Sequence, residues 1–396
     1  MLLKHVTVKN FRNYQDATLE LSPSRNLLIG ENAQGKTNLL EAIEIMANMR
    51  RTRGASDREL VMVGQSQAFI EVGYVSQGIA ENASLTYALN PRLSKTIKIN
   101  GVKQTRNELS GRISRLTAVS FSSRDLSLLR GGPKDRRDWL DDVMGKLRHS
   151  LYELLSKYEK VVQQRNRLLK TLFEKGRVSV SDQDELKVWD TQLCRYGSRI
   201  IKSRVDTLAL ILPGAEANQS RVSGLKEKLN AAYIFREHDQ DEPQNEQEVG
   251  QAASVGDLVE ATVEEIEERI AKSLKMRRAE EIARKQTLTG PHRDDISFAL
   301  NDLSAQSFGS QGQQRSLVLS LKLAELKLVE EHLAEPPLLL LDDVLAELDL
   351  SRQGMLMELV QDKMQTLITT THLDGFRPEW LTGAQITKVV QGRLES

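Results

Sequence analysis

The stretch Gly30-Glu31-Asn32-Ala33-Gln34-Gly35-Lys36-Thr37 has the spacing of a phosphate-binding loop. It follows the apolar run Leu27–Ile29 and precedes the apolar positions of a helix, from Leu39 to Met46. A buried strand, a glycine-rich turn and a helix form the setting that this motif needs. Glycine lets the backbone curl so that its N–H groups point at phosphate oxygens, and the helix N-terminus adds a positive dipole. The stretch therefore predicts an α/β fold with a nucleotide site after a buried strand.

Residues 30–38 are all candidates for nucleotide contacts, and two of them have further roles. The Lys36 ammonium can reach the β- and γ-phosphates of ATP, which makes it a candidate for catalysis as well as for binding. The Thr37 hydroxyl suits a magnesium ion. We therefore expect ATP and Mg²⁺ as ligands. The other candidate contacts in the loop are Gly30, Glu31, Asn32, Ala33, Gln34, Gly35 and Asn38.

Two aspartates follow a second buried strand. Pro336-Pro337 ends the preceding helix, and the four leucines of Leu338–Leu341 are typical of a strand that is buried on both faces. Asp342 is the candidate magnesium ligand, and Asp343 is the candidate for orienting or deprotonating the attacking water. A solvated turn or a helix cap would also explain aspartates after a strand, but the phosphate loop favours the metal site.

A third strand is expected at Leu367–Thr371, and it delivers His372 to the edge of the sheet. A single histidine is usually structural. At the end of a strand in this kind of site, however, a histidine is suited to sensing the γ-phosphate, and His372 is therefore a candidate catalytic residue.

The stretch Ser310-Gln311-Gly312-Gln313-Gln314-Arg315 has the pattern of an ABC-type signature. Ser310 offers a hydroxyl, Gly312 permits close backbone approach, and Gln313 lies in the first turn of a helix, so all three are candidate nucleotide contacts. The signature lies too far from the phosphate loop for a compact transporter ATPase, and the middle of the chain must loop out. This order predicts an α/β ABC-type ATPase head. We expect a mixed sheet with a phosphate-loop core, an antiparallel β subdomain and an inserted α-helical arm.

The β subdomain is expected near the N-terminus. Apolar and polar residues alternate in Leu2–Lys9 and in Ala17–Leu21, which predicts two strands. Further strands are expected at 68–75, 84–89, 95–99 and 102–103, with Asn100-Gly101 as a two-residue hairpin turn. Arg12, between the first two strands, is either a solvated turn residue or a nucleotide contact.

The arm is expected at residues 148–285, and the head at 1–147 and 286–396. A helical stripe runs through Leu151, Leu155, Tyr158, Val162, Arg165, Leu169 and Leu172. A second helix is expected from about Ser181 or Asp184, and a third over Leu258–Arg284. Residues 238–256 hold few apolar side chains and many acids, so a mobile acidic loop is expected there. A plain helical subdomain with no mechanical role remains an alternative to an arm.

Composition limits the possible classes of protein. The chain has 396 residues, of which 28% are charged, and its 55 basic residues equal its 55 acidic ones, so any contact with nucleic acid must come from local basic patches. The single cysteine, Cys194, excludes a disulfide framework and is expected in a core. No signal peptide opens the chain and no apolar run is long enough for a membrane, so we expect a cytoplasmic protein.

The chain resembles the RecF family, bacterial DNA gap-repair proteins related to the ATPase heads of SMC proteins. The paired aspartates and the stretch Gly290–Asp295 separate this family from transporter ATPases, whose second acid is normally glutamate. The chain departs from the family in two places, because the usual proline is absent from Phe121–Leu126 and no glutamine occupies an evident Q-loop position. The resemblance rests on Asn10–Tyr14, Gly30–Asn38, Arg130–Pro133, Arg136-Arg137, Thr289–Asp295, Ser310–Arg315, Asp342-Asp343 and Glu347–Asp349.

The resemblance implies an ATP-dependent homodimer that binds double-stranded DNA and gapped or single-strand junctions. Such a protein would act with RecR and RecO to load the RecA recombinase in DNA repair and replication restart. Its ATPase would be stimulated by DNA. It would also be weak, since the Asp343 side chain is one methylene shorter than glutamate. The alternatives are a transporter ATPase subunit and a structural DNA clamp that does not respond to nucleotide.

Several basic clusters are candidates for contacts with DNA phosphates, which would be independent of base sequence. A charge run is more often a solvated face, so no single cluster is favoured. The clusters are Arg50–Arg53, Arg112 with Arg115, Lys134 with Arg136 and Arg137, and the arm residues Lys157, Lys160, Arg165, Arg167 and Lys170.

Overall fold

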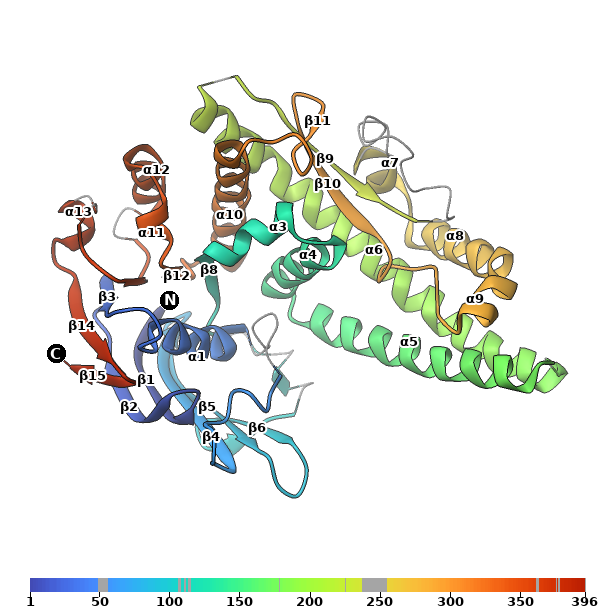
Figure 1. Ribbon diagram of the computed structural model, residues 1–396, viewed down its shortest axis with the longest axis horizontal. Helices are drawn as coiled ribbons and strands as arrows, with labels where there is room; N and C mark the ends of the chain where they lie inside the picture. The colour runs from blue at the N-terminus through green and yellow to red at the C-terminus, as the bar shows by residue number, and fades with distance from the viewer. Residues whose placement is uncertain are drawn as a thin grey trace. The chain divides into compact units, whose positions relative to one another are not determined.

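The computed structural model describes residues 1–48, 56–105, 108–109, 112, 115–177, 179–224, 226–236, 255–360, 363–374, 376 and 378–395 (Figure 1). These residues divide into two compact units, one of residues 1–125 and 325–396 and the other of residues 126–324. The second unit contains the expected arm and also the segments that flank it. The division into a head at 1–147 and 286–396 and an arm at 148–285 remains a prediction. Of the expected acidic loop at 238–256, residues 238–254 lie outside the described residues, whereas Val255 and Gly256 are not part of a loop but begin a helix, α7, Val255–Glu260.

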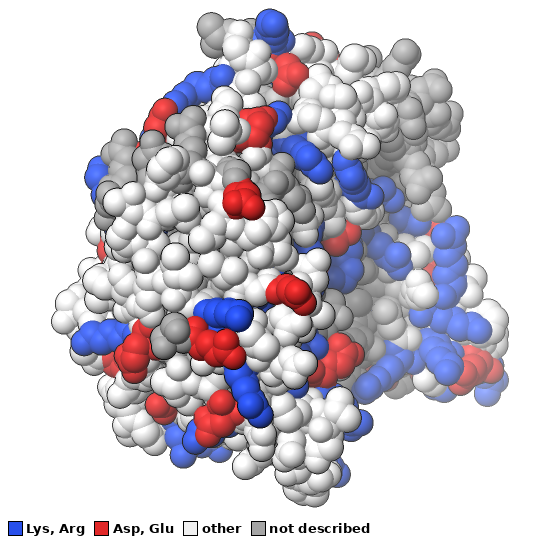
Figure 2. All heavy atoms as spheres, turned by 60° about the vertical axis from the view of Figure 1, so that its left-hand side comes forward, with Lys and Arg blue, Asp and Glu red and all other residues white. Residues whose placement is uncertain are grey.

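The surface carries both signs of charge. On the face drawn in Figure 2, Lys and Arg lie among Asp and Glu, in keeping with the equal numbers in the sequence. Among the residues that the structure describes, no helix is both long and apolar enough to cross a membrane.

The first unit contains an antiparallel sheet of six strands, in the order β2-β1-β4-β5-β6-β7. Its edge carries the Asn100-Gly101 turn, which has the positive φ angles expected of a two-residue hairpin turn. All the strands predicted for this subdomain are present. Their bounds are β1 Leu2–Phe11, β2 Tyr14–Glu20, β4 Gln67–Ser76, β5 Ile79–Ala88, β6 Ser94–Ile99 and β7 Val102–Lys103.

The first unit also contains a mixed sheet in the order β15-β14-β3-β13-β12-β8. The five strands from β14 to β8 are parallel, and β15 pairs antiparallel with β14. Strands from both ends of the chain therefore lie side by side in one sheet, as the order of the motifs predicted. The bounds are β3 Arg25–Ile29, β8 Ala118–Ser122, β12 Leu338–Asp342, β13 Thr366–Thr370, β14 Gln385–Val390 and β15 Arg393–Glu395.

One apolar core joins these two sheets. Helix α1, Lys36–Asn48, buries Leu39, Ile43 and Met46 in a cluster with residues of both sheets, such as Val6 and Leu340. Because α1 starts at the end of the phosphate loop, its buried face holds the loop against the parallel sheet. Short helices complete the unit: η1 Ser123–Leu126, α11 Val344–Glu347, α12 Leu350–Val360 and α13 Pro378–Leu381.

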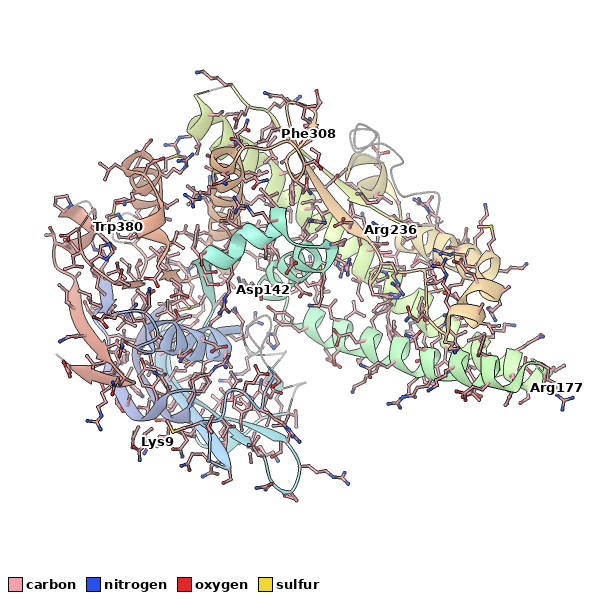
Figure 3. The ribbon with its side chains drawn as sticks, viewed as in Figure 1. Lys9, Asp142, Arg177, Arg236, Phe308 and Trp380 are labelled. Carbon is pink, nitrogen blue, oxygen red and sulfur yellow. The ribbon has the colours of Figure 1, made fainter. Side chains whose placement is uncertain are left out.

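The second unit is mainly helical. Its long helices α5, Ser150–Lys175, and α6, Val180–Ser223, run side by side, and Figure 3 shows Arg177 at the free end of this pair. The bounds of the shorter helices are α3 Ser127–Arg130, α4 Pro133–Leu147, α7 Val255–Glu260, α8 Val263–Met276 and α9 Arg278–Arg284. Helix α10, Gln311–Leu333, begins in this unit, and the boundary between the units falls after Ala324.

The helices of the second unit differ from expectation in two ways. The single helix expected over Leu258–Arg284 is wrong: it is divided into α7, α8 and α9. The reason is a capping box, in which Thr262 and Glu265 satisfy each other's backbone N–H groups and start α8 afresh. On α5 the buried stripe includes Val161 and Leu168, whereas Val162 is only partly buried.

A small antiparallel sheet, β11-β10-β9, packs with these helices. Its strands are β9 Leu229–Ile234, β10 Asp295–Leu300 and β11 Leu303–Ser304. Every residue of β10 is buried. The stretch Thr289–Asp295, one of those on which the family resemblance rests, leads into this strand. It therefore lies in the interior of the second unit.

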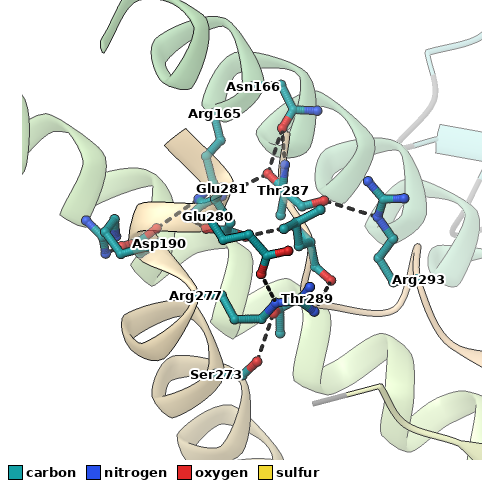
Figure 4. A network of polar contacts seen from close by, with 12 residues as sticks. Arg165, Asn166, Asp190, Ser273, Arg277, Glu280, Glu281, Thr287, Thr289 and Arg293 are labelled. Carbon is teal, nitrogen blue, oxygen red and sulfur yellow. Dashed lines mark hydrogen bonds and ion pairs between the residues drawn. The ribbon is translucent and has the colours of Figure 1, made fainter. Parts of the chain in front are cut away.

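A buried polar network holds the helices to this stretch (Figure 4). Arg165 has no exposed surface and donates hydrogen bonds to Asp190 at 2.9 Å, to Thr287 at 2.9 Å and to Glu281 at 2.5 Å. Removing one partner from such a buried charged pair typically costs 3–5 kcal/mol, because the other charge is left unpaired. We therefore expect Arg165 to serve the stability of the second unit.

The structure reduces the number of basic residues that could contact DNA. The proposals that Arg165 and Arg136 contact DNA are wrong, because Arg165 lies in the buried network and Arg136 is buried in a two-bond ion pair with Asp295. Arg112 pairs with Glu81. The cluster Arg50–Arg53 lies outside the described residues.

Candidate nucleotide-binding site

The candidate site lies at the carboxyl ends of three neighbouring parallel strands. Strand β3 leads directly into the phosphate loop, β12 ends at Asp342, and β13 ends two residues before His372. The register places Asp342 beside Thr369 of β13 and beside Ser122 of β8. Ligands of open α/β sheets bind at this edge, so the fold brings the predicted residues of the first unit together where the motif requires them.

The glycines of the phosphate loop are needed for different reasons. Gly35 has a φ angle of +119°, which L side chains rarely adopt. Gly30 has no such angle, but a Cβ there would lie 2.3 Å from the carbonyl oxygen of Val389 on β14. Backbone curl therefore explains only Gly35, whereas the close approach of a neighbouring strand explains Gly30. The turn between them is completed by Ala33, at a φ angle of 64°.

Lys36 is buried at the start of α1, and its ammonium points back into the loop. Its Nζ donates hydrogen bonds to the carbonyl oxygens of Gly30 at 2.7 Å and of Glu31 at 3.0 Å. The ammonium thus sits inside the curve of the loop, at the first turn of a helix, where phosphate binding is favoured. This arrangement agrees with the predicted position of a phosphate-binding lysine.

One carboxylate oxygen of Asp342 joins the two ends of the chain. Its Oδ1 accepts hydrogen bonds from the Thr37 hydroxyl at 2.8 Å and from the Thr369 hydroxyl at 2.7 Å. The Thr369 hydroxyl in turn accepts a hydrogen bond from the backbone N–H of Asp343 at 2.9 Å. Thr369 is buried, so this position is well fixed. A single hydroxyl therefore orients both of the aspartates.

The oxygen atoms at this point fit a magnesium ion. Mg²⁺ prefers oxygen ligands, typically one or two carboxylates together with waters and phosphate oxygens, and Thr37 with Asp342 offers a hydroxyl and one carboxylate. Among the described residues no group of three His, Cys, Asp or Glu side chains forms a metal site of its own. The ion would thus need phosphate and water to complete its shell, as in nucleotide-dependent sites.

Asp343 is half-buried beside this position, in a left-handed backbone conformation with a φ angle of 55°. Burial raises the pKa of its carboxyl group above the ordinary value, and the neighbouring Asp342 charge adds to the rise, whereas Lys36 and His372 oppose it. A raised pKa increases the basicity of the carboxylate, which favours a role in accepting a proton. His372 itself is exposed, and its Nδ1 bonds to the Thr371 hydroxyl at 2.7 Å.

Two hairpin turns brace the phosphate loop from outside. The Asn13 side chain donates to the Gln34 carbonyl at 2.9 Å and accepts from the Asn38 amide at 2.9 Å, and the Tyr14 hydroxyl donates to the Gly35 carbonyl at 3.0 Å. From the turn between β14 and β15, Gly392 also donates its N–H to the Gln34 carbonyl, at 2.9 Å. The loop is thus held in shape before any ligand arrives.

Arg12, a candidate nucleotide contact, has another partner in this structure. Its guanidinium makes two hydrogen bonds of 2.9 Å to the Glu41 carboxylate on α1 and a third, of 3.1 Å, to the Glu59 carbonyl. The hydrogen bond with Glu41 is the main reason that the Arg12 pKa is raised. Arg12 therefore links the β1–β2 turn to α1, and its contact with nucleotide remains a prediction.

The signature residues form the start of α10, in the second unit. Ser310 and Gln313 cap this helix reciprocally: the Ser310 N–H donates to the Gln313 side chain at 2.8 Å, and the Gln313 N–H donates to the Ser310 hydroxyl at 3.3 Å. Gln313 also donates to Glu227 at 2.9 Å. Gly312 is exposed, and a Cβ there would meet no atom within 4 Å. Neither a strained φ angle nor internal crowding thus explains glycine at this position.

Sequence reasoning missed Thr369 and the bracing residue Asn13 as parts of the site. Thr369 lies in an Ile-Thr-Thr-Thr run, where threonine is equally expected from its preference for strands. Asn13 lies in a turn, where asparagine is common for local reasons. Only the pairing of β13 with β12 and the packing of the turn against the loop reveal their partners.

Comparison with known proteins agrees with this geometry. The family described as RecF/RecN/SMC N terminal domain matches residues 2–391. The chain is 41% identical to the DNA replication and repair protein RecF of Synechocystis sp., over 403 residues that cover 100% of this chain and 98% of that protein. It is also 41% identical to the protein of the same description from Nostoc punctiforme, covering 100% of this chain and 99% of that one.

This chain belongs to the RecF family. Membership confirms the family resemblance and decides against the alternative of a transporter subunit. A solved structure of the recombination mediator protein RecF-ATPrS in the RecFOR pathway matches with a TM-score of 0.83 and 31% identity, covering 99% of this chain and 97% of that one. A structure of RecF-ATP matches with a TM-score of 0.81 and 30% identity. The predicted α/β ATPase-head fold is confirmed by these RecF structures.

Proposed function

We propose that this RecF-family chain is an ATP-dependent, DNA-binding recombination mediator. The observation that carries the proposal is the bond between Thr37, at the end of the phosphate loop, and Asp342, at the end of β12. These two residues come from opposite ends of the chain and supply the oxygen ligands that Mg²⁺–ATP needs. The related structures described as RecF-ATP and RecF-ATPrS support the same ligand.

We assign the hydrolytic roles within this proposal as follows. Lys36 binds the β- and γ-phosphates, while Thr37 and Asp342 hold Mg²⁺, which neutralises phosphate charge when it is bound. Asp343 orients the attacking water and takes its proton, and His372 contacts the γ-phosphate. The backbone of residues 30–38 contacts the phosphates, and Arg12 would have to exchange Glu41 for the nucleotide. Because Asp343 is shorter than glutamate, we expect hydrolysis to be weak. We also propose that DNA stimulates it.

The signature residues act across a homodimer in this proposal. Ser310, Gly312 and Gln313 of one protomer would face the γ-phosphate that a second protomer holds. The exposed position of Gly312, with open space around it, supports close approach by a group from outside the chain. ATP would then hold the two protomers together around a two-fold axis, and hydrolysis would release them.

The cellular role that we propose is based on the descriptions of the related proteins. The curated relatives are described as DNA replication and repair proteins, and the solved ones as recombination mediators of the RecFOR pathway. We infer that this chain binds double-stranded DNA and gapped junctions in the cytoplasm. There it works with RecR and RecO to load RecA. The competing function is a structural clamp that binds DNA equally with and without nucleotide.

One pair of measurements tests the proposal. Lys36→Ala should lower ATP affinity by about tenfold or more, because a charge-assisted contact worth roughly 1.5–3 kcal/mol is lost. Calorimetric titration measures this loss, and Lys388→Ala, which removes an exposed lysine of β14, is the control. DNA affinity should depend on ATP in the wild type and lose this dependence in Lys36→Ala. Equal DNA binding with and without ATP would favour the clamp.

A further inference from the structure

The edge of the antiparallel sheet carries a segment whose charges are all positive and to which no role has been assigned. Residues 90–105 carry Arg92, Lys95, Lys98 and Lys103 and contain no acidic residue. All four cations are exposed. In a chain with equal numbers of acids and bases, such a segment needs a separate explanation.

The strand register concentrates two of these charges. Lys98 of β6 lies directly opposite Lys103 of β7 in the antiparallel pair. Like charges directly opposite each other destabilise a hairpin. The turn nevertheless keeps them together, because the Asn100 N–H donates to the Asn82 carbonyl at 2.8 Å and the Asn82 N–H donates to the Asn100 side chain at 2.9 Å. The hairpin thus holds two repelling charges in a fixed position.

Most of these cations have no acidic partner within the part of the chain that the structure describes. Among the described residues, Arg92, Lys98 and Lys103 take part in no ion pair, while Lys95 lies over the Tyr87 ring. Lys4, Lys160 and Lys187 likewise have no ion pair among the described residues, but other exposed lysines do have acidic partners. Examples are Lys9 with Asp16, Lys134 with Asp138, Lys157 with Glu153 and Lys388 with Glu395.

The face of the sheet around the lysines is polar. The register places Ser84 of β5 next to Lys98, and it pairs Thr86 with Thr96. The next residue across the sheet from Ser84 is Glu71, which is two strands away from Lys98. Its Oε1 lies 4.0 Å from Nε2 of His5. Hydroxyl groups and unpaired lysines on one face are the donors that contact phosphate and sugar in DNA complexes.

We propose that the β6–β7 hairpin, residues 94–103, binds the phosphate backbone of double-stranded DNA. Lys98 and Lys103 neutralise neighbouring phosphates, and the hydroxyls of Ser84 and Thr96 lie beside them on the same face. The contact is independent of base sequence, since DNA carries about one charge per 1.7 Å along its axis whatever its bases. The inference rests on the proposed DNA-binding function and names the surface that performs it. DNA also relieves the repulsion that the hairpin otherwise maintains.

The salt dependence of binding tests this surface. The wild type and the double variant Lys98→Gln/Lys103→Gln are titrated with fluorescent duplex DNA, with ATP present, at salt from 50 to 200 mM. Each lost phosphate contact lowers the slope of log affinity against log salt by about 0.9, so the double variant should lose about 1.8. The matched control is Lys9→Gln/Lys388→Gln, which removes the same charge from paired, exposed lysines of the same unit. Its slope should stay within about 0.5 of the wild type.

The outcomes are distinct. An unchanged slope in the Lys98→Gln/Lys103→Gln variant, or an equal drop in the control variant, overturns the hairpin contact and leaves DNA binding itself in place. A wild type that binds no duplex at any of these salt concentrations overturns the proposed function as well. Thermal unfolding shows whether the double variant still folds. Removing two like charges from the hairpin should leave its Tm equal to that of the wild type or higher.

Discussion

The hydroxyl of Thr369 lies 2.7 Å from Oδ1 of Asp342, and the same hydroxyl accepts a hydrogen bond from the backbone N–H of Asp343. One side chain on β13 therefore sets the orientation of the candidate magnesium ligand and of the residue assigned to the attacking water. This relationship links the two predicted acidic roles through one buried side chain.

Thr369→Val keeps the shape of the side chain but removes the hydroxyl. Because a hydrogen bond to a charged group is worth about 1.5–3 kcal/mol, we expect the hydrolysis rate to fall between about tenfold and a hundredfold. The Mg²⁺ concentration for half-maximal rate should rise, and Thr369→Ser should restore both values. Thr366→Val is the control, since this buried hydroxyl of the same strand donates its hydrogen bond to the Met364 carbonyl, away from the aspartates. A normal magnesium dependence in Thr369→Val would rule out the positioning role.

Asp343→Asn should bind ATP and abolish steady-state hydrolysis, since an amide cannot take a proton from water. In the wild type, a raised pKa means that the Asp343 carboxylate becomes protonated at a higher pH than an ordinary aspartate. Hydrolysis should therefore fall as the pH is lowered, with its midpoint above the ordinary aspartate value. Phosphate release measured across pH in both proteins checks this. Hydrolysis at the wild-type rate by Asp343→Asn would remove Asp343 from the mechanism.

Gly312→Leu should block dimerisation without harming the protomer. The position is exposed at the start of α10 and a Cβ meets no atom there, so replacing glycine in a helix should leave stability equal or raise it by up to about 1 kcal/mol. ATP binding should persist, while light scattering with ATP should detect monomers only. Ser310→Arg should have the same effect, but it also removes a helix cap worth about 1 kcal/mol. An ATP-dependent Gly312→Leu dimer would contradict the two-chain site, and Gly132→Leu, at another uncrowded glycine, is the control.

Asp294 should make the stability of the second unit depend on pH. Burial raises the pKa of its carboxyl group to about 7, despite hydrogen bonds from the Tyr233 hydroxyl and the Arg236 N–H. The folded state therefore holds the proton more tightly than the unfolded state. Its stabilising contribution is complete below about pH 4 and is lost as the pH rises through about 7.

The variant Asp294→Asn is isosteric with the protonated side chain. We therefore expect its Tm to match that of the wild type near pH 5 and to exceed it at pH 8. The difference in stability should change by at most about 1.4 kcal/mol per pH unit within the window. Melting curves at several pH values measure this. A wild type that gains stability relative to Asp294→Asn at pH 8 would show that the neighbouring cations outweigh burial.

Local patterns predicted those parts of the fold that depend on neighbouring residues. The phosphate loop, the leucine strand before Asp342 and the Asn100-Gly101 turn each carry their signal within a few residues. The break before α8 also had such a signal, the capping-box pattern of Thr262 and Glu265, which the apolar spacing of the longer helix obscured.

Features that depend on distant partners could not be predicted. Arg165 has the spacing of a helical stripe, but its burial depends on Asp190 and Glu281, which lie on other helices. Thr369 is unremarkable until β13 pairs with β12. In both cases the deciding contact is formed only by tertiary packing, and a single sequence carries no local trace of it.

The position of β3 inside the parallel sheet determines when the nucleotide site can form during synthesis. Its two neighbours, β13 and β14, are translated only after the whole second unit. A nascent chain that has already folded its helical unit on the ribosome still lacks both strand partners of β3, and Gly392 has not yet reached the phosphate loop. We therefore expect ATP binding only from chains translated through Gly392, since shorter chains contain the loop without the strands and the turn that hold its shape.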